Sequence, residues 1–321
     1  MPAAEIRYRA ASSRSAVKVL KDLVNRAFRQ AGFVLHRIPT VPDQESAYLR
    51  AGRIPWGPGY DHARFGFVRR AVDDPTLLEV FRTRGNLPAG YGEGIDERCV
   101  EFPWLVSQLD HGPGRVLDAG SALNYAFALD HPTIRPKQVH IMTLAPEPNC
   151  FWNKGVSYLF GDLRDIPMRD AHYDIIVCLS TLEHIGSDNT LFTNKDDARE
   201  DRPNDFIQVM REFRRVLKVG GTLWLTVPFG KYRHYGAFQQ FDQSLLSTAI
   251  GAFGRADISE TFYRYGTDGW TIADAEECGA SSYVEWVAKV WAGAPWPQPL
   301  PVEPDRAAAA RAVACVRLRK V

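Results

Sequence analysis

The chain has 321 residues and a formal net charge of +1 at pH 7, a balance that does not favour a nucleic-acid partner. Hydrophobic residues make up 45% of it, enough for a sizeable core, and no run of about 20 apolar residues is present to span a membrane. Its five cysteines are scattered, which argues against a disulfide framework and against a thiolate zinc site. We expect one large domain with additions, in a reducing cytoplasm.

An amphipathic helix is predicted near the start, over residues 15–39. Apolar side chains recur there at spacings of three and four, and basic side chains dominate the rest of its surface. Two interpretations are open. The helix packs on its own domain, or it lies on an anionic membrane surface and gives the protein a peripheral contact with the inner face of a membrane.

Residues 41–94 are rich in glycine, proline and aromatic residues, and only residues 74–84 show a helical period. This composition predicts an irregular cap with short helices, which either covers a pocket or wraps the domain as a structural element. Together with the first helix it forms the predicted N-terminal extension, residues 1–100.

From Arg115 onward, short β-branched runs alternate with helical stretches, which predicts an α/β fold with a doubly wound, mostly parallel sheet. A strong helix over residues 204–221 ends at a Gly-Gly pair, and a second helix is expected near residues 243–253. A proline-rich excursion at residues 291–305 precedes the last strand. The predicted strands are 115–120, 138–144, 156–162, 173–180, 221–228, 256–265 and 312–320.

Three segments of this region together resemble the class I S-adenosylmethionine (SAM)-dependent methyltransferases. RVLDAGSALN resembles the motif acid-x-Gly-x-Gly-x-Gly, although only Gly120 of the three glycines is present. GDLRDIPMRDAHYDIIVCLSTLEHIG is similar to the family's segment from the third strand to the end of the fourth. FRRVLKVGGTLWLTVPFG is similar to the family's Leu-Lys-Pro-Gly-Gly hinge, with Val219 in place of proline. The resemblance covers about residues 101–321 and implies a seven-stranded, Rossmann-like methyltransferase domain with SAM as its cofactor.

In a doubly wound sheet, ligands bind beyond the carboxyl ends of the strands, where the strand order reverses. The resemblance implies that Asp118 faces the methionyl ammonium group, that Asp162 accepts from the adenine amine, and that the amide of Leu163 binds a ring nitrogen. The purely structural alternatives are that Asp118 caps the next helix and that Asp162 forms a turn. The expected cofactor-binding residues are Asp118, Gly120, Ser121, Glu147, Asp162, Leu163 and Ser180.

The end of the second strand departs from the family, which usually has an acidic residue there for the ribose hydroxyls. Thr143 comes first, and Glu147 follows only after a proline. Glu147 is the candidate because a carboxylate accepts two hydroxyl hydrogen bonds at once. An exposed loop glutamate is the alternative.

Methyl transfer to an alcohol requires a base as the hydroxyl attacks, and a histidine suits that task. His184, just after the fourth predicted strand, is the first candidate base, and His234, after the fifth, is the second. A backbone-bonded helix-start histidine and a surface loop are their structural alternatives. A divalent metal held by Glu183, His184 and His234 is a less favoured arrangement, because adjacent residues on a helix point apart.

The loop after the fifth strand interleaves aromatic and basic side chains, which suits a sugar face or an anionic group. The expected acceptor-binding residues are Glu183, Tyr232, Arg233 and Tyr235. Residues 187–205 form a polar insertion without apolar period, predicted to be a loop that either covers the site or is simply solvated.

The function indicated is SAM-dependent O-methylation of a small molecule or a saccharide, in a pathway such as polysaccharide biosynthesis. The alternative from another class is a catalytically idle SAM-fold protein that acts as a binding partner or scaffold, which the altered glycine motif favours. The sequence does not name the acceptor or the oligomeric state.

Overall fold

The computed structural model describes residues 41–193, 195–285 and 302–321. Residues Gln44–Val321 form one compact unit, to which the description below applies. The amphipathic helix predicted at residues 15–39 and most of the proline-rich excursion lie outside the described residues. None of the helices in the described part combines the length and the apolar character needed to cross a membrane.

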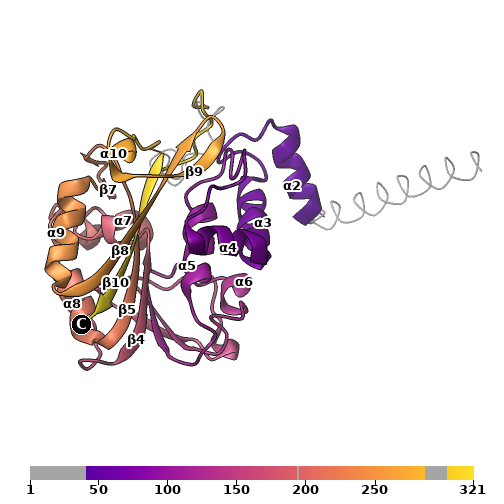
Figure 1. Cartoon of the computed structure of the whole chain (residues 1–321). Coiled ribbons are helices and arrows are strands. Elements are labelled where there is room, and N and C mark those ends of the chain that lie inside the picture. Colours follow the sequence, from indigo (N-terminus) through magenta and orange to yellow (C-terminus); the bar gives the residue numbers. More distant parts are fainter. Residues whose placement is uncertain (1–40, 194, 286–301) are drawn as a thin grey trace, which may run out of the picture. The chain divides into compact units, whose positions relative to one another are not determined.

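An eight-stranded sheet, in the order β3-β2-β1-β4-β5-β10-β8-β9, forms the centre of this unit (Figure 1). The five strands from β3 to β5 are parallel, and β10 is antiparallel to both of its neighbours. This confirms the mostly parallel α/β fold. The strands are β1 (Arg115–Ala119), β2 (Gln138–Thr143), β3 (Ser157–Phe160), β4 (Tyr173–Leu179), β5 (Leu217–Pro228), β8 (Ala256–Gly266), β9 (Gly269–Ala273) and β10 (Ala312–Lys320).

The sheet has one strand more than the seven predicted, because β8 and β9 form a hairpin. Thr267 and Asp268 connect the paired residues Gly266 and Gly269, and Gly269 has a φ of 84°, which glycine adopts without strain. The Asp-Gly pair followed by WTI is a hairpin signal that the strand prediction missed.

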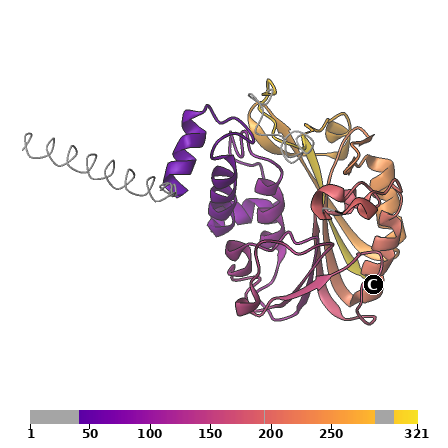
Figure 2. The ribbon, with the colours of Figure 1, turned by 180° about the vertical axis from the view of Figure 1, so that it is seen from behind.

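The buried strands separate two hydrophobic cores. In β4, Val177 and Leu179 belong to one core, whereas Ile176 and Cys178 belong to the other. Successive side chains of a strand point to opposite faces, so an apolar run without alternation is the pattern of a sheet covered on both sides. In Figures 1 and 2, α3, α4 and α5 lie on one side of the sheet, and α8 and α9 lie on the other.

Residues 41–94, predicted to be an irregular cap with short helices, contain more helix than the sequence pattern indicates. The irregular segment contains α2 (Val41–Arg50), a 14-residue α3 (Tyr60–Asp73) and the expected α4 (Pro75–Thr83). The period of α3 is weak because only four of its residues are buried, so packing rather than pattern specifies it. An unpredicted helix, α5 (Arg98–Gln108), spans the expected domain boundary between residues 100 and 101, and that boundary stays a prediction.

The remaining elements lie mostly near the carboxyl ends of the strands. The polar insertion, predicted to lack regular structure, contains α7 (Thr190–Thr193) and a 3-10 turn, η3 (Asp196–Ala198). The others are α6 (Ala126–Leu129), η1 (Trp152–Lys154), η2 (Leu182–His184), α8 (Phe206–Val216), β6 (Arg233–His234), β7 (Gln239–Gln240), α9 (Gln243–Phe253) and α10 (Ala275–Cys278).

Candidate active site

The ends of β1 and β4 meet at the point where the strand order reverses. Both strands run parallel in adjacent positions, with Asp118 paired to Val177, so the residues after them share one edge of the sheet. Gly120, with a φ of 102°, packs so tightly on Thr181 that an added Cβ would lie 2.1 Å from the Thr181 Oγ1. The side chain that Gly120 accommodates in this structure is that of Thr181.

Asp118 is fully buried and organises the loop that follows β1. Its two carboxylate oxygens accept from the backbone amides of Ala122, at 3.1 Å, and Leu123, at 2.8 Å. Burial raises the pKa of Asp118 to about 7, although the two amides oppose the shift. The carboxylate therefore holds the loop after β1, but it does not cap the next helix, α6, whose N-cap is Tyr125.

Two serines at this edge have left-handed backbones. Ser121 has a φ of 67° and Ser180 a φ of 41°. Such conformations cost roughly 1–3 kcal/mol each for a residue with a side chain, and they concentrate at functional sites. Ser180 is held by its bond to Glu101 Oε1 at 2.5 Å, whereas the buried hydroxyl of Ser121 has no hydrogen-bond partner among the described residues.

The loops after β1 and β2 are joined through Asn124. Its amide nitrogen donates to Glu147 Oε2 at 2.9 Å, and its oxygen accepts from the hydroxyl of Tyr158 at 2.8 Å. Glu147 itself is exposed, so the displaced acid of the second strand still reaches this edge. Asn124 stands where the family motif has a glycine, and its side chain supplies the contact that places Glu147.

Asp162 follows β3, and Arg164 surrounds its carboxylate. The Nε of Arg164 lies 3.0 Å from both oxygens, and the backbone amide of Arg164 donates to Oδ1 at 2.8 Å. The side chain of Asp162 is nevertheless 37% exposed. The neighbouring Leu163 is buried in the core, which fixes the chain at this turn.

Arg98 is a residue of this edge that the sequence reasoning missed. It begins α5, and its Nη1 donates to Glu101 Oε2 at 2.8 Å and to the carbonyl of Leu179 at 3.2 Å, at the last residue of β4. Its side chain is 27% exposed, whereas Glu101 is fully buried. The apolar spacing of residues 99–106 was the available signal for α5, which would have placed a cation beside the sheet edge.

His184, at the end of η2, has a defined tautomer. Its Nδ1 lies 2.8 Å from the carbonyl oxygen of Ala237, which can only accept, so Nδ1 carries the proton and Nε2 carries the lone pair. Burial lowers the pKa of His184 to about 4, so the ring is neutral at physiological pH. Phe192 and Phe238 pack against the ring, with centroids at 5.2 Å and 5.8 Å.

His234 presents a different arrangement on β6. Its Nδ1 accepts from the amide of Gly236 at 3.2 Å, so its proton lies on Nε2, 3.4 Å from the hydroxyl of Ser187. The lone pair of His234 is therefore occupied by backbone. Among the described residues, no group of three or more histidine, cysteine, aspartate or glutamate side chains is arranged to hold a metal ion.

The expected acceptor residues differ in exposure. Glu183 is buried, its Oε2 has no partner in the described part of the chain, and burial raises its pKa well above the ordinary range. Tyr232 is 46% exposed, and the Arg233 guanidinium lies 4.9 Å from the centroid of the Tyr235 ring. Tyr235 stacks on Phe238 at a centroid distance of 4.8 Å, and Phe238 also packs against His184. These three rings form one aromatic cluster.

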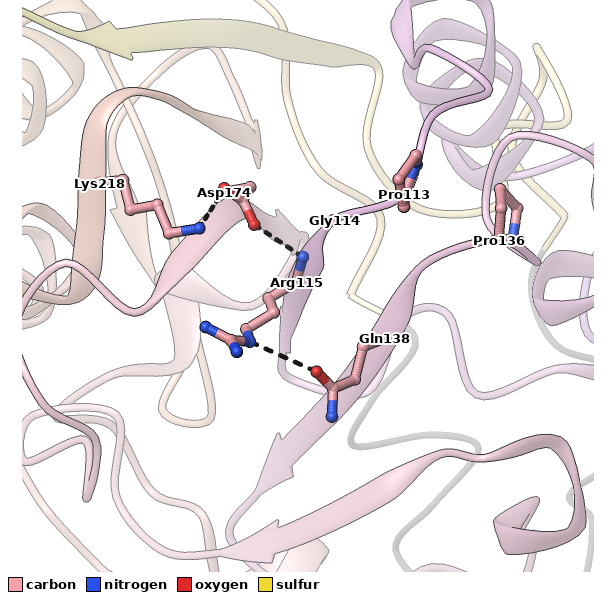
Figure 3. A pocket seen from close by; sticks show the side chains of 7 residues that line it. All are labelled: Pro113, Gly114, Arg115, Pro136, Gln138, Asp174 and Lys218. Atoms are coloured by element: carbon pink, nitrogen blue, oxygen red, sulfur yellow. Dashed lines mark hydrogen bonds and ion pairs between the residues drawn. The ribbon is translucent and has the colours of Figure 1, made fainter.

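A cavity of about 370 Å³ lies at the opposite edge of the sheet (Figure 3). Arg115, Gln138, Asp174 and Lys218 line it, and each stands at the first or second position of its strand. Asp174 binds both Lys218 and the backbone amide of Arg115 there. This cavity is at the amino ends of the strands and is separate from the candidate active site.

Comparison with known proteins identifies the region that carries this edge. Residues 109–225, from just before β1 into β5, match the family model of a methyltransferase domain. The chain carries a methyltransferase domain. This class of methyltransferase is SAM-dependent, so SAM is the cofactor. Asp118, Asp162 and His184 all lie within the matched region. A search of the curated proteins found no match.

The chain is also similar to several solved structures, at low sequence identity. The 1,6-didemethyltoxoflavin-N1-methyltransferase of Burkholderia thailandensis, solved with S-adenosylhomocysteine, is 12% identical, with 89% of this chain and 94% of that one covered and a TM-score of 0.39. The YcgJ protein of Bacillus subtilis is 13% identical, with 67% and 94% covered and a TM-score of 0.41. A SAM-dependent methyltransferase of Methanosarcina mazei is 12% identical, with 68% and 98% covered and a TM-score of 0.39.

Proposed function

We propose that this methyltransferase transfers the methyl group of SAM to a hydroxyl group of a small molecule or a saccharide, with His184 as the base. The observation that carries the proposal is the tautomer of His184. The carbonyl of Ala237 holds the proton on Nδ1, so the lone pair of Nε2 is available to a hydroxyl proton. Methylation of an amine that is already neutral would need no such base.

The residues at the carboxyl edge fit a sulfonium nucleoside. SAM supplies an electrophilic methyl group when it is bound. The partly exposed side chain of Arg98 suits the methionyl carboxylate, Glu147 suits the ribose hydroxyls, and Asp162 suits the adenine amine. The unpartnered hydroxyl of Ser121 is a buried polar atom that a ligand in this place would satisfy.

His184 would act on an acceptor that lies against its Nε2. As the acceptor oxygen bonded to the methyl carbon, the carbon–sulfur bond of SAM would break, S-adenosylhomocysteine would leave as a neutral thioether, and the acceptor proton would pass to Nε2, while the carbonyl of Ala237 keeps the ring oriented. A pKa of about 4 makes His184 a weak base but keeps it neutral and ready at every physiological pH. Phe192 and Phe238 exclude water around the ring, which favours displacement over hydrolysis.

The ring of Tyr235 supports a ring-shaped acceptor. Tyr235 is partly exposed and stacks on the buried Phe238, and an apolar sugar face packs well on such a ring. Arg233, exposed beside Tyr235, would bind an anionic substituent of the acceptor. We further propose a role in polysaccharide biosynthesis in the cytoplasm, with peripheral membrane contact through the helix predicted at residues 15–39.

Calorimetry with SAM tests the cofactor site. We expect micromolar binding to the full chain, and a loss of at least roughly tenfold in Asp162→Ala because a hydrogen bond to a charged group is removed. Asp174→Ala, at the opposite edge, is the matched control and should leave the affinity unchanged. No binding at millimolar SAM would refute the methyl-donor site and favour an idle scaffold.

The acceptor is found by mass spectrometry of metabolites and surface glycans from cells with and without the gene. We expect one methyl ether to disappear when the gene is absent. The corresponding hydroxyl compound, lighter by one CH2 group, should appear in its place. A change confined to methylated amines would contradict the proposal of O-methylation.

A further inference from the structure

Arg164 connects the loop after β3 to a segment beyond β4. Its five side-chain N–H groups all have carboxylate acceptors. Nε and Nη2 donate to Asp162, Nη1 donates to Glu200 at 2.8 Å and to Asp205 at 2.5 Å, and Nη2 also donates to Glu200 at 2.9 Å. The guanidinium is only 17% exposed, so these are more than loose surface pairs.

Residues 195–205, which we call the strap, carry Glu200 and Asp205 and reach the acceptor side of the site. The amide of Arg202 donates to the carbonyl of Gly186 at 2.7 Å, and the amide of Asn189 donates to the carbonyl of Ala198 at 3.0 Å. Asn189 also donates from its side chain to the carbonyl of His184 at 3.1 Å. The strap therefore contacts both Arg164, which binds Asp162, and residues 186–189, which follow His184.

We propose that Arg164 is a positioning residue, which orients Asp162 toward the adenine amine and couples adenine binding to the order of the strap. The proposal rests on the cofactor role proposed above for Asp162. It adds a specificity determinant for that site, whose partners Glu200 and Asp205 come from the polar insertion of this chain.

The acceptor capacity of Asp162 supports this role. A carboxylate has about four lone-pair sites. Three N–H groups of Arg164 contact the carboxylate: the backbone amide on Oδ1, Nη2 on Oδ2, and Nε shared between the two oxygens. Three donor protons on about four lone-pair sites leave room for about one further donor. The adenine ring carries a single exocyclic amine. The remaining exposure of Asp162 shows that this last site is accessible to a ligand.

Arg164 also keeps Asp162 charged. Burial alone would raise the pKa of Asp162, but the hydrogen bonds from Arg164 outweigh it and hold the pKa below its ordinary value. Lysine cannot replace this geometry, because an ammonium group lacks the planar fork that binds three carboxylates at once.

The experiment compares two ligands that differ in the amine alone. S-adenosylhomocysteine carries the amine, and its 6-deamino purine analogue carries a hydrogen atom in its place and keeps N1 as an acceptor. Calorimetry measures both affinities for the wild-type chain, Arg164→Met and Arg164→Lys. The matched control is Arg215→Met, because Arg215 also pairs with two carboxylates, Glu212 and Asp170, but does not touch Asp162.

We expect the wild type and Arg215→Met to prefer S-adenosylhomocysteine by roughly tenfold or more, as for one hydrogen bond to a charged group. In both Arg164 variants the preference should fall to within about threefold. A merely structural role would weaken both ligands equally and leave the ratio unchanged, and that result would overturn the proposal. Failure of the wild type to bind either ligand would instead refute the proposed function itself.

Limited proteolysis with trypsin tests the coupling between adenine binding and the order of the strap, because the strap contains the cleavage sites Lys195 and Arg199. We expect S-adenosylhomocysteine to slow cleavage there in the wild type and in Arg215→Met, and to have little effect in Arg164→Met. Equal protection in all three proteins would contradict the link between adenine and the strap.

Discussion

At the scale of single residues, the two candidate bases differ in which nitrogen holds the proton. The Nδ1 of His184 faces a carbonyl, whereas the Nδ1 of His234 faces an amide. The lone pair of His184 therefore lies on Nε2, on the side away from the backbone, and that of His234 is used by the chain itself. The partner of His234 is two residues away, whereas the partner of His184 is 53 residues away, so the sequence around His184 does not show which of its nitrogens holds the proton.

Nitrogen-15 NMR of the His184 ring tests this difference. Because burial lowers the pKa of His184 to about 4, we expect the ring to stay neutral between pH 8 and pH 5.5, with its single proton on Nδ1 throughout. The signal is assigned by its loss in His184→Ala, a variant that should also lose roughly 10²–10⁴-fold in turnover while keeping its SAM affinity. The urea-unfolded chain, where histidines titrate near about 6.5, is the reference. A folded pKa near 6.5, or a proton on Nε2, would contradict the assignment.

At the scale of elements, the sequence locates the strand ends but not what fills the space between them. The carboxyl ends of parallel strands lie on one edge of the sheet, so the predicted strands 115–120 and 173–180 suffice to bring Gly120 and Ser180 together. Contacts between side chains depend on loop paths that no local pattern specifies. The packing of Thr181 on Gly120 and the binding of Glu200 by Arg164 are two such contacts, which the sequence does not predict.

Gly120→Ala tests how closely the β1 and β4 loops pack. The added Cβ would overlap Thr181 and force a side chain to a φ of 102°, so we expect a loss of roughly 2–4 kcal/mol in the free energy of unfolding. Thr181→Gly removes the overlapping atoms, so the double variant should recover at least about 1 kcal/mol, leaving the backbone strain. Urea unfolding of the four proteins measures the coupling. Additive losses would mean that the two loops do not contact each other as described.

At the scale of the whole molecule, a buried carboxylate joins the cap to the far end of the chain. Glu97 precedes α5, and its Oε2 accepts from the amide of Ala310 at 3.2 Å, across 213 residues of sequence. Burial, together with the nearby charges of Asp96 and Glu101, raises the pKa of Glu97 to about 8. Global unfolding exposes this group, so its protonation is linked to the stability of the entire unit.

The sign of that linkage gives the pH dependence. Between about pH 4.5 and 8, folded Glu97 keeps a proton that the unfolded chain has released, so this group lowers the free energy of unfolding as pH rises, by up to about 1.4 kcal/mol per pH unit. Glu97→Gln cannot titrate, so the stability of the wild type relative to this variant should fall steadily from pH 5 to pH 8 and then level off. Urea unfolding at pH 5, 6, 7 and 8 measures the difference. A constant difference over that range would show that Glu97 is ionised in the folded protein, and that the junction between the cap and β10 is open to water.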